Sequence, residues 1–187
     1  MAELPKASAR LSQIERDDLP ADQQHIYDEI AGSRGAVRGP FAMLLHSPEV
    51  AGRIAHTGAY IRFETTLPDD LRELAILTTA RFWDCQYEWT AHQKIAEGEA
   101  GTRPEAIAAV RDRQAPAGLS ADEVIVFNYV SELLNNHRVS DATYKAAHDR
   151  WGNRTVVDLT ATAGYYSMIA GTLNAFAVEP DSPTLPI

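Results

Sequence analysis

Apolar residues three and four positions apart recur through nearly the whole sequence between residues 20 and 180. This spacing puts them on one side of an α-helix, whereas a β-strand would alternate apolar and polar residues. No such alternation is longer than chance, and the sequence contains no internal repeat of fixed period. The pattern therefore predicts an all-α fold, a compact bundle of about seven to eight helices.

Capping residues mark where several of these helices begin. Ser47 precedes a proline, and this pair suits a helix start because serine caps free amide groups and proline fits the first helical position. Ser120 with Glu123, and Thr102 with Glu105, have the spacing of a capping box. The predicted helices span residues 20–35, 47–66, 68–82, 85–101, 102–113, 120–134, 140–152 and 153–179.

The length of 187 residues fits one domain with a short segment at each end. We expect residues 1–20 to be an arm that packs on the body or on a neighbour, and residues 21–179 to be a single helical domain. Residues 180–187 contain three prolines and are expected to be a tail without regular structure. The last helix, 153–179, is apolar over much of its circumference, which predicts a central position or a subunit contact.

Charge and hydropathy exclude several classes of protein. The chain has 26 acidic and 17 basic residues, a net charge of −9 and no basic cluster, so we expect no nucleic-acid partner. No apolar run approaches the roughly 18 residues of a membrane span, and we expect no membrane partner. The N-terminus lacks the apolar core of a signal peptide, which predicts a cytoplasmic protein. Cys85 is the one cysteine, so no disulfide can form within the chain.

One predicted helix concentrates the residue types that carry chemistry. In the sequence CQYEWTAHQKIA, which begins at Cys85, a turn of about 100° per residue places Cys85, Glu88 and His92 on one face. That face also carries apolar residues and is expected to point inward: Trp89, Ile95 and Ala96. The opposite face is expected to meet solvent: Thr90, Gln93, Lys94 and Glu97.

Glu88 and His92 are four positions apart and can touch. One interpretation is an ordinary exposed pair on a helix surface. The apolar neighbours favour another, a buried carboxylate with an imidazole as its partner. Such a pair supplies a base poised near neutral pH. Glu73, on the preceding predicted helix, is either a second buried acid or a solvated residue.

The spacing Glu73-x11-Cys85-x2-Glu88-x3-His92 resembles the active-site pattern of the carboxymuconolactone decarboxylase/alkylhydroperoxidase D superfamily. There the pattern is Glu-x11-Cys-x2-Cys-x3-His, often with a further histidine one residue before the second cysteine. The segment LRELAILTTARFWDCQYEWTAHQKIAEGEAG is similar to the core segment of the family. The resemblance implies an alkylhydroperoxidase D-like helical protomer, a homo-oligomer of trimers or hexamers, and a pocket near a subunit contact.

The chain departs from this pattern at two positions. Glu88 stands where redox members of the family carry the second cysteine, and Tyr87 stands where they carry the extra histidine. A dithiol peroxidase cycles through a disulfide, and Cys85 alone cannot close that cycle within one chain. The resemblance therefore carries over to Glu73, Cys85 and His92, and it favours the decarboxylase-type branch that lacks the thiol pair.

This resemblance implies a cofactor-free lyase or isomerase that acts on a small carboxylated lactone or ring acid. Loss of CO₂ leaves a carbanion or enolate that must be reprotonated, and a histidine oriented by a carboxylate suits that step. We expect His92 to be the acid/base, Glu88 its orienting partner and Glu73 a second proton carrier. The substrate carboxylate needs a cation, for which the candidates nearest in sequence are Arg53, Arg62 and Arg81, each of which is otherwise a surface charge.

Aromatic residues are candidates for the lining of the substrate pocket, although such residues at helical spacing also build cores: Phe63, Tyr87, Trp89, Tyr165 and Tyr166. Three alternatives to the lyase stay open. Cys85 could serve a peroxiredoxin-like peroxidase with an external thiol, provided that its pKa is depressed. The protein could be a non-catalytic helical oligomer that binds a small ligand. Glu73, Glu88 and His92 could also hold a metal ion, although we expect no metal and no cofactor.

Overall fold

The computed structural model describes residues 9–181 and 187, which form eight α-helices, one short 3-10 helix and no strand. The predicted all-α class and helix number are confirmed. The 3-10 helix spans Arg16–Asp18. The α-helices are α1 (Gln24–Arg34), α2 (Pro40–Leu44), α3 (Pro48–Phe63), α4 (Asp69–Phe82), α5 (Gln86–Glu97), α6 (Pro104–Arg111), α7 (Ala121–Asn136) and α8 (Asp141–Ala175).

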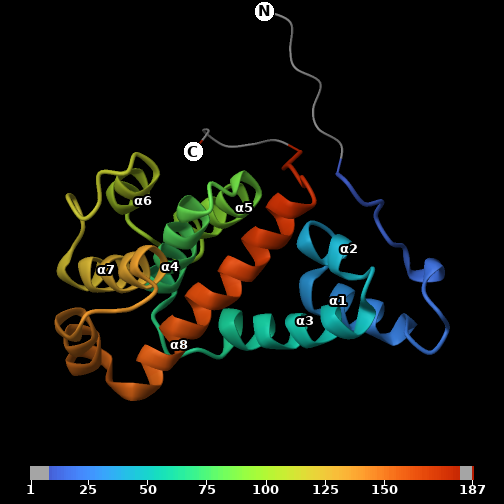
Figure 1. Cartoon of the computed structure of the whole chain (residues 1–187), viewed down its shortest axis with the longest axis horizontal. Coiled ribbons are helices and arrows are strands. Elements are labelled where there is room, and N and C mark those ends of the chain that lie inside the picture. Colours follow the sequence, from blue (N-terminus) through green and yellow to red (C-terminus); the bar gives the residue numbers. More distant parts are fainter. Residues whose placement is uncertain (1–8, 182–186) are drawn as a thin grey trace, which may run out of the picture.

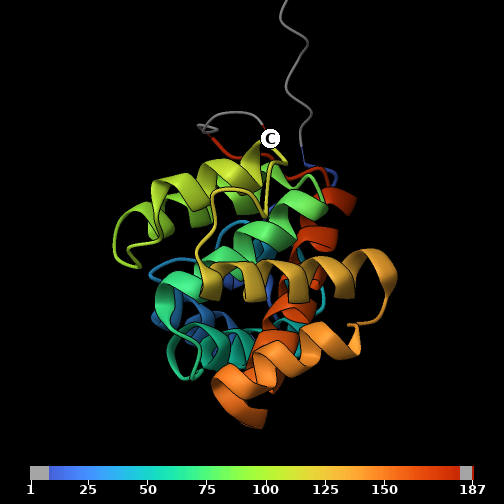
Figure 2. The same cartoon turned by 90° about the vertical axis from the view of Figure 1, so that its left-hand side faces the viewer.

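The long helix α8 runs diagonally through the molecule and separates two groups of helices (Figure 1). On one side α4 packs against α5, α6, α7 and α8. On the other side α1 packs on α3, and α2 and α3 pack on α8. Figure 2 shows α7 lying across the outer side of the first group, between α6 and the first turns of α8. The predicted central position of the last helix is therefore correct.

Helix α4 is surrounded on all sides, and every residue from 71 to 80 is buried. The sequence pattern predicted only an apolar stripe there, because three- and four-residue spacing identifies one face. Four neighbouring helices cover the remaining faces as well. Glu73 lies in this run, so its carboxyl group is in the interior of the protein.

Several helix ends differ from the prediction for identifiable reasons. Helix α3 ends at Phe63 because the amide and hydroxyl of Thr66 both donate to Oδ2 of Asp158, each at 2.9 Å, which ties the connection to α8. Thr102 does not cap α6, because its hydroxyl donates to the carbonyl oxygen of Asp70 at 3.0 Å. The capping box at Ser120 is confirmed. The short helix α2 was not predicted.

The segment labelled α8 consists of two helices that meet at a kink at Gly152, so the predicted boundary between residues 152 and 153 is correct. Gly152 has φ 77° and ψ 177°, values outside the helical region, and α8 continues on both sides of it. A positive φ is accessible to glycine because it has no Cβ. The bend lets residues 141–151 pack beside α7 while the rest of α8 crosses the molecule.

The described part of the predicted arm, residues 9–20, lies against the helical body. The amide of Arg10 donates to the carbonyl oxygen of Phe176 at 2.8 Å, and Nε2 of His46 donates to that of Ser12 at 2.9 Å. Residues 1–8 of the predicted arm and 182–186 of the predicted tail lie outside the described residues. Among the described helices, none has the length and hydropathy that a membrane span requires.

Candidate functional site

A cavity of about 420 Å³ opens between the two groups of helices. Its walls come from α1 and the loop after it, α2, the end of α3, α5 and α8. Eight of its lining residues have polar groups that could meet a ligand: Arg34, Arg38, Arg62, Tyr87, Glu88, His92, Tyr165 and Tyr166. A concave site with a few convergent polar groups is the usual setting of a small-molecule site.

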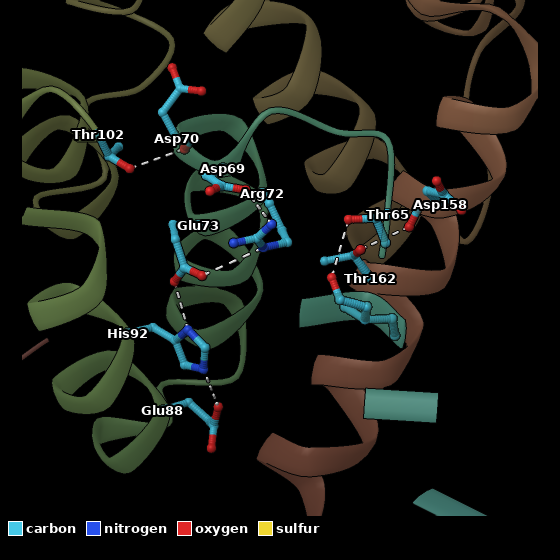
Figure 3. A network of polar contacts seen from close by, with 11 residues as sticks. Thr65, Asp69, Asp70, Arg72, Glu73, Glu88, His92, Thr102, Asp158 and Thr162 are labelled. Carbon is cyan, nitrogen blue, oxygen red and sulfur yellow. Dashed lines mark hydrogen bonds and ion pairs between the residues drawn. The ribbon is translucent and has the colours of Figure 1, made fainter. Parts of the chain in front are cut away.

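One wall of this cavity contains an imidazole between two carboxyl groups (Figure 3). Nδ1 of His92 lies 2.7 Å from Oε2 of Glu73, and Nε2 of His92 lies 3.5 Å from Oε2 of Glu88. The three side chains are 9%, 3% and 6% exposed, respectively. The structure therefore brings together and buries the predicted acid/base His92, its predicted orienting partner Glu88 and the predicted second proton carrier Glu73.

The geometry fixes how the imidazole is used. A carboxylate can only accept, so Nδ1 of His92 donates to Glu73 and leaves Nε2 facing Glu88. Tyr166 stands edge-on to the His92 ring, with centroids 4.8 Å apart. Burial raises the pKa of the Glu88 carboxyl above its ordinary value, although His92 and nearby arginines act in the opposite direction. Glu88 thus holds a proton more readily than an exposed glutamate does.

Arg72 lies behind Glu73, on the side away from His92 (Figure 3). Its Nη1 donates to Oδ1 of Asp69 at 2.6 Å, and its Nε lies 3.8 Å from Oε1 of Glu73. The Arg72 side chain is only 11% exposed. A buried carboxylate needs a compensating charge, and Arg72 supplies one to Glu73.

Three arginines line the cavity, whereas the sequence analysis expected one cation for the substrate carboxylate. Arg62 lines the cavity, as predicted, together with Arg34 and Arg38, which were not among the predicted site residues. Their only sequence signal was the Gly/Arg-rich composition of the segment SRGAVRGP. Arg53 is exposed and pairs with Glu49 at 3.3 Å, on another part of α3.

Arg81 and Trp89, predicted to bind substrate, lie away from the cavity. Arg81 pairs with Asp84 and donates to the carbonyl oxygen of Arg111 at 2.8 Å, beside a separate cavity of about 170 Å³. Trp89 is fully buried, and its indole donates to Oε1 of Gln93 at 2.8 Å. Trp89 points into the core between α4, α5 and α6 rather than toward a ligand.

The outer face predicted for α5 is partly wrong. Thr90 and Gln93 were expected to meet solvent, but they are 4% and 9% exposed. Helix α5 contacts α4, α6 and α8, so more than one of its faces is covered. Of the aromatic candidates, Tyr87, Tyr165 and Tyr166 line the cavity, and Phe63 is 64% exposed.

Cys85 caps the start of α5 and is 1% exposed. Burial raises the pKa of its thiol to about 12, and the charge of Glu88 acts in the same direction. The thiol is not among the groups that line the cavity. The depressed pKa that a peroxidatic cysteine requires is therefore not present at this position.

Within the described residues, no group of three or more His, Cys, Asp or Glu side chains has the arrangement of a metal site. The predicted alternative of a metal ion held by Glu73, Glu88 and His92 therefore gains no support from their geometry. Two of the three groups instead share a direct hydrogen bond.

Solved structures with the same fold include two bacterial proteins. The first is the alkylhydroperoxidase AhpD core of an uncharacterized peroxidase-related protein from Ralstonia eutropha JMP134, with 18% identity, a TM-score of 0.77 and 93% of each chain covered. The second is an uncharacterized peroxidase-related protein from Silicibacter sp. TM1040, with 18% identity, a TM-score of 0.74, and 99% of this chain and 96% of that chain covered. At this identity the similarity establishes the fold.

No curated protein matches the sequence. The sequence model of the carboxymuconolactone decarboxylase family matches residues 48–132, a range that contains Glu73, Cys85, Glu88 and His92. The match and the shared fold agree with the spacing of these residues in the sequence. Residues 48–132 of the chain are thus similar to the carboxymuconolactone decarboxylase family, and the chain as a whole shares the fold of the alkylhydroperoxidase D-like structures.

Proposed function

We propose that the protein is a cofactor-free acid/base enzyme, a lyase or isomerase that acts on a small carboxylated lactone or ring acid. The observation that carries this proposal is the buried chain of Glu73, His92 and Glu88 at the wall of a cavity that three arginines also line. The carboxyl and imidazole groups can move a proton, and the arginines can hold an anionic substrate.

The proposed decarboxylation and isomerisation both balance in atoms and electrons without an added reagent. In a decarboxylation, the carbon–carbon bond to the carboxylate breaks, CO₂ leaves, and the electron pair stays on the ring carbon as a carbanion or enolate. A proton from Glu88 or His92 then neutralises that carbon. In an isomerisation, the same pair takes a proton from one carbon and returns it to another.

The distances favour an exchange of the roles expected for the two acids. Glu73 makes the hydrogen bond to Nδ1 of His92 but does not line the cavity, so we assign it the orienting role. Glu88 lines the cavity and has a raised pKa, so we assign it the exchange of protons with substrate, together with His92. Glu73 is then a positioning residue.

The peroxidase alternative has less support in this chain. Cys85 is the single cysteine of the sequence, it is buried, and its pKa is raised to about 12. Intact-mass spectrometry after a pulse of peroxide separates the two ideas. We expect no prompt gain of one oxygen atom on Cys85, whereas a prompt gain that thiols reverse would favour the peroxidase.

Assays on carboxymuconolactone-type substrates test the proposal. We expect turnover by the wild-type protein and a loss of about 10²–10⁴-fold in kcat for His92→Gln and Glu88→Gln. Arg53→Gln is the matched control, because Arg53 is an exposed cation outside the cavity. Full activity in both site variants would overturn the assignment. A non-catalytic oligomer that binds a small ligand would show no turnover in any of these proteins, and assembly into trimers or hexamers stays a prediction.

A further inference from the structure

Gly58 leaves a notch in α3 that two cavity residues fill. A Cβ atom on Gly58 would lie 2.1 Å from the hydroxyl oxygen of Tyr165 and 2.9 Å from Nη2 of Arg34. These distances are far below van der Waals contact, so only glycine leaves room for both groups. The absence of a side chain at this one position brings a phenol from α8 and a guanidinium from α1 against the same point of α3.

Arg34 is held in place but keeps hydrogen-bonding capacity. Its Nη2 donates to the carbonyl oxygen of Ala55 at 3.2 Å, and its guanidinium lies 4.1 Å from the centre of the Phe41 ring. Its Nε is buried and has no hydrogen-bond partner within the described part of the chain. A guanidinium has five N–H donors in a planar fork, and buried donors without partners are costly. The Nε–H group of Arg34 is therefore available to donate a hydrogen bond to an acceptor group of a ligand.

The positive charge at this point is not balanced by a carboxylate. No acidic side chain of the described residues forms an ion pair with Arg34. Burial lowers the pKa of the Arg34 guanidinium, and the positive charge of Arg62 lowers it further. Glu88 is the acid that feels both cations, and burial favours its neutral form. A ligand that brings one negative charge would compensate this imbalance.

Tyr165 adds a neutral donor beside the charge. Burial raises the pKa of its phenol to about 12, so the hydroxyl keeps its proton at neutral pH. The Tyr165 hydroxyl and Nη2 of Arg34 both lie against Gly58, so the phenol and the guanidinium are close neighbours. The phenol and the guanidinium both line the cavity that contains Glu88 and His92.

We propose that Arg34 and Tyr165, seated in the notch at Gly58, form the subsite that receives a carboxylate group of the ligand. This inference rests on the proposed function for the choice of a carboxylate ligand. Arg34, Gly58 and Tyr165 belong to three different helices. Arg34 and Tyr165 lie outside residues 48–132, the range that matches the family model. The subsite is thus a feature that α1 and α8 add to the shared core.

Binding of benzoate, compared with its neutral analogue benzamide, tests the subsite without any need for turnover. Isothermal titration calorimetry at neutral pH would measure both ligands on wild-type protein and on Arg34→Gln, Arg34→Lys, Tyr165→Phe and Gly58→Ala. Gly164→Ala is the matched control for the glycine, because a Cβ there would meet nothing within 4 Å. Arg53→Gln controls for the loss of one positive charge.

We expect benzoate to bind wild-type protein about tenfold or more tightly than benzamide, and Arg34→Gln to remove that preference. Tyr165→Phe and Gly58→Ala should each weaken benzoate several-fold, and Arg34→Lys should retain part of the affinity. Circular dichroism checks that each variant is folded, and Arg34→Lys with Tyr165→Phe decides the matter if Arg34→Gln does not fold.

The inference fails if wild-type protein does not bind benzoate, if it binds benzamide equally well, or if the Arg34 and Tyr165 variants keep full affinity. These outcomes are distinct from a failure of the proposed function. That failure would appear as unchanged turnover in His92→Gln and Glu88→Gln, whatever the binding data show.

Discussion

Nδ1 of His92 and Oε2 of Glu73 lie 2.7 Å apart although the two residues are nineteen positions apart in the sequence. The bond joins α5 to α4 in the interior, where both side chains are almost completely shielded from water. An interaction between helices fixes the imidazole more firmly than the pair with Glu88 on the same helix could do alone. It leaves Nε2 for the cavity.

Removing this carboxylate should disable the imidazole without removing it. Glu73→Gln keeps the shape of the side chain but loses the charge that orients and balances His92. We expect a fall of about 10²-fold or more in kcat with little change in KM, because Glu73 does not reach the ligand. Steady-state kinetics on a carboxymuconolactone-type substrate measures both constants. A rise in KM alone would contradict the positioning role.

Arg72 should stabilise the folded protein because its positive charge compensates the buried carboxylate of Glu73. Arg72→Met leaves a buried carboxylate without its cation, and we expect the free energy of unfolding to fall by about 3 kcal/mol. The double variant Arg72→Met/Glu73→Gln should recover most of that loss, since it no longer contains an unpaired charge. Urea denaturation of the four proteins measures the coupling. Simple additivity of the two substitutions would contradict it.

Glu88 should make the fold less stable as the pH rises. Burial raises its pKa in the folded protein above the ordinary value of about 4.3, so the folded state binds this proton more tightly than the unfolded state does. The free energy of unfolding must then decrease as the pH passes from below that value through the raised pKa. Glu88→Gln removes this dependence.

Thermal melts of wild-type protein and Glu88→Gln at several pH values check the sign. The variant should gain stability over wild-type protein as the pH increases from about 4 to about 8. Glu49→Gln, which changes an exposed acid on α3, serves as the control and should show no such trend. A difference between Glu88→Gln and wild-type protein that does not vary with pH would contradict the raised pKa.

Cys85 should react slowly in the folded protein. Its thiol is buried and its pKa is raised to about 12, so little thiolate exists near pH 8. Iodoacetamide labelling followed by mass spectrometry should be slow in buffer and fast in urea. Cys85→Ala should retain turnover on the proposed substrates. Rapid labelling of the folded chain would show that the thiol is accessible and ionised.

Helical periodicity predicted the part of the site that lies on α5. Glu88 and His92 share a face of α5 because they are four residues apart, and their apolar neighbours correctly indicated an inward orientation. The depth of Glu73 could not be predicted in this way, since it depends on four helices that pack around α4. For the same reason the burial of Thr90 and Gln93 was missed.

The arginines show a second limit of the sequence. Arg62 was found because it lies close to the motif, whereas Arg34 reaches the cavity only through the packing of α1 on α3. Its partner Tyr165 lies 131 positions further along the chain, on α8. Contacts between such distant segments leave no periodic signal. Trp89 was misplaced because apolar spacing does not distinguish a core face from a pocket wall.

Nuclear magnetic resonance of ¹⁵N-labelled histidine tests most directly that His92 bridges two buried acids. We expect a proton on Nδ1, held by the hydrogen bond to Glu73, and a ¹⁵N signal of Nε2 that shifts in Glu88→Gln. Glu73→Leu should release Nδ1 and change the tautomer. Spectra of His92 that match a free imidazole in water, and that neither substitution alters, would show that His92 does not bridge Glu73 and Glu88.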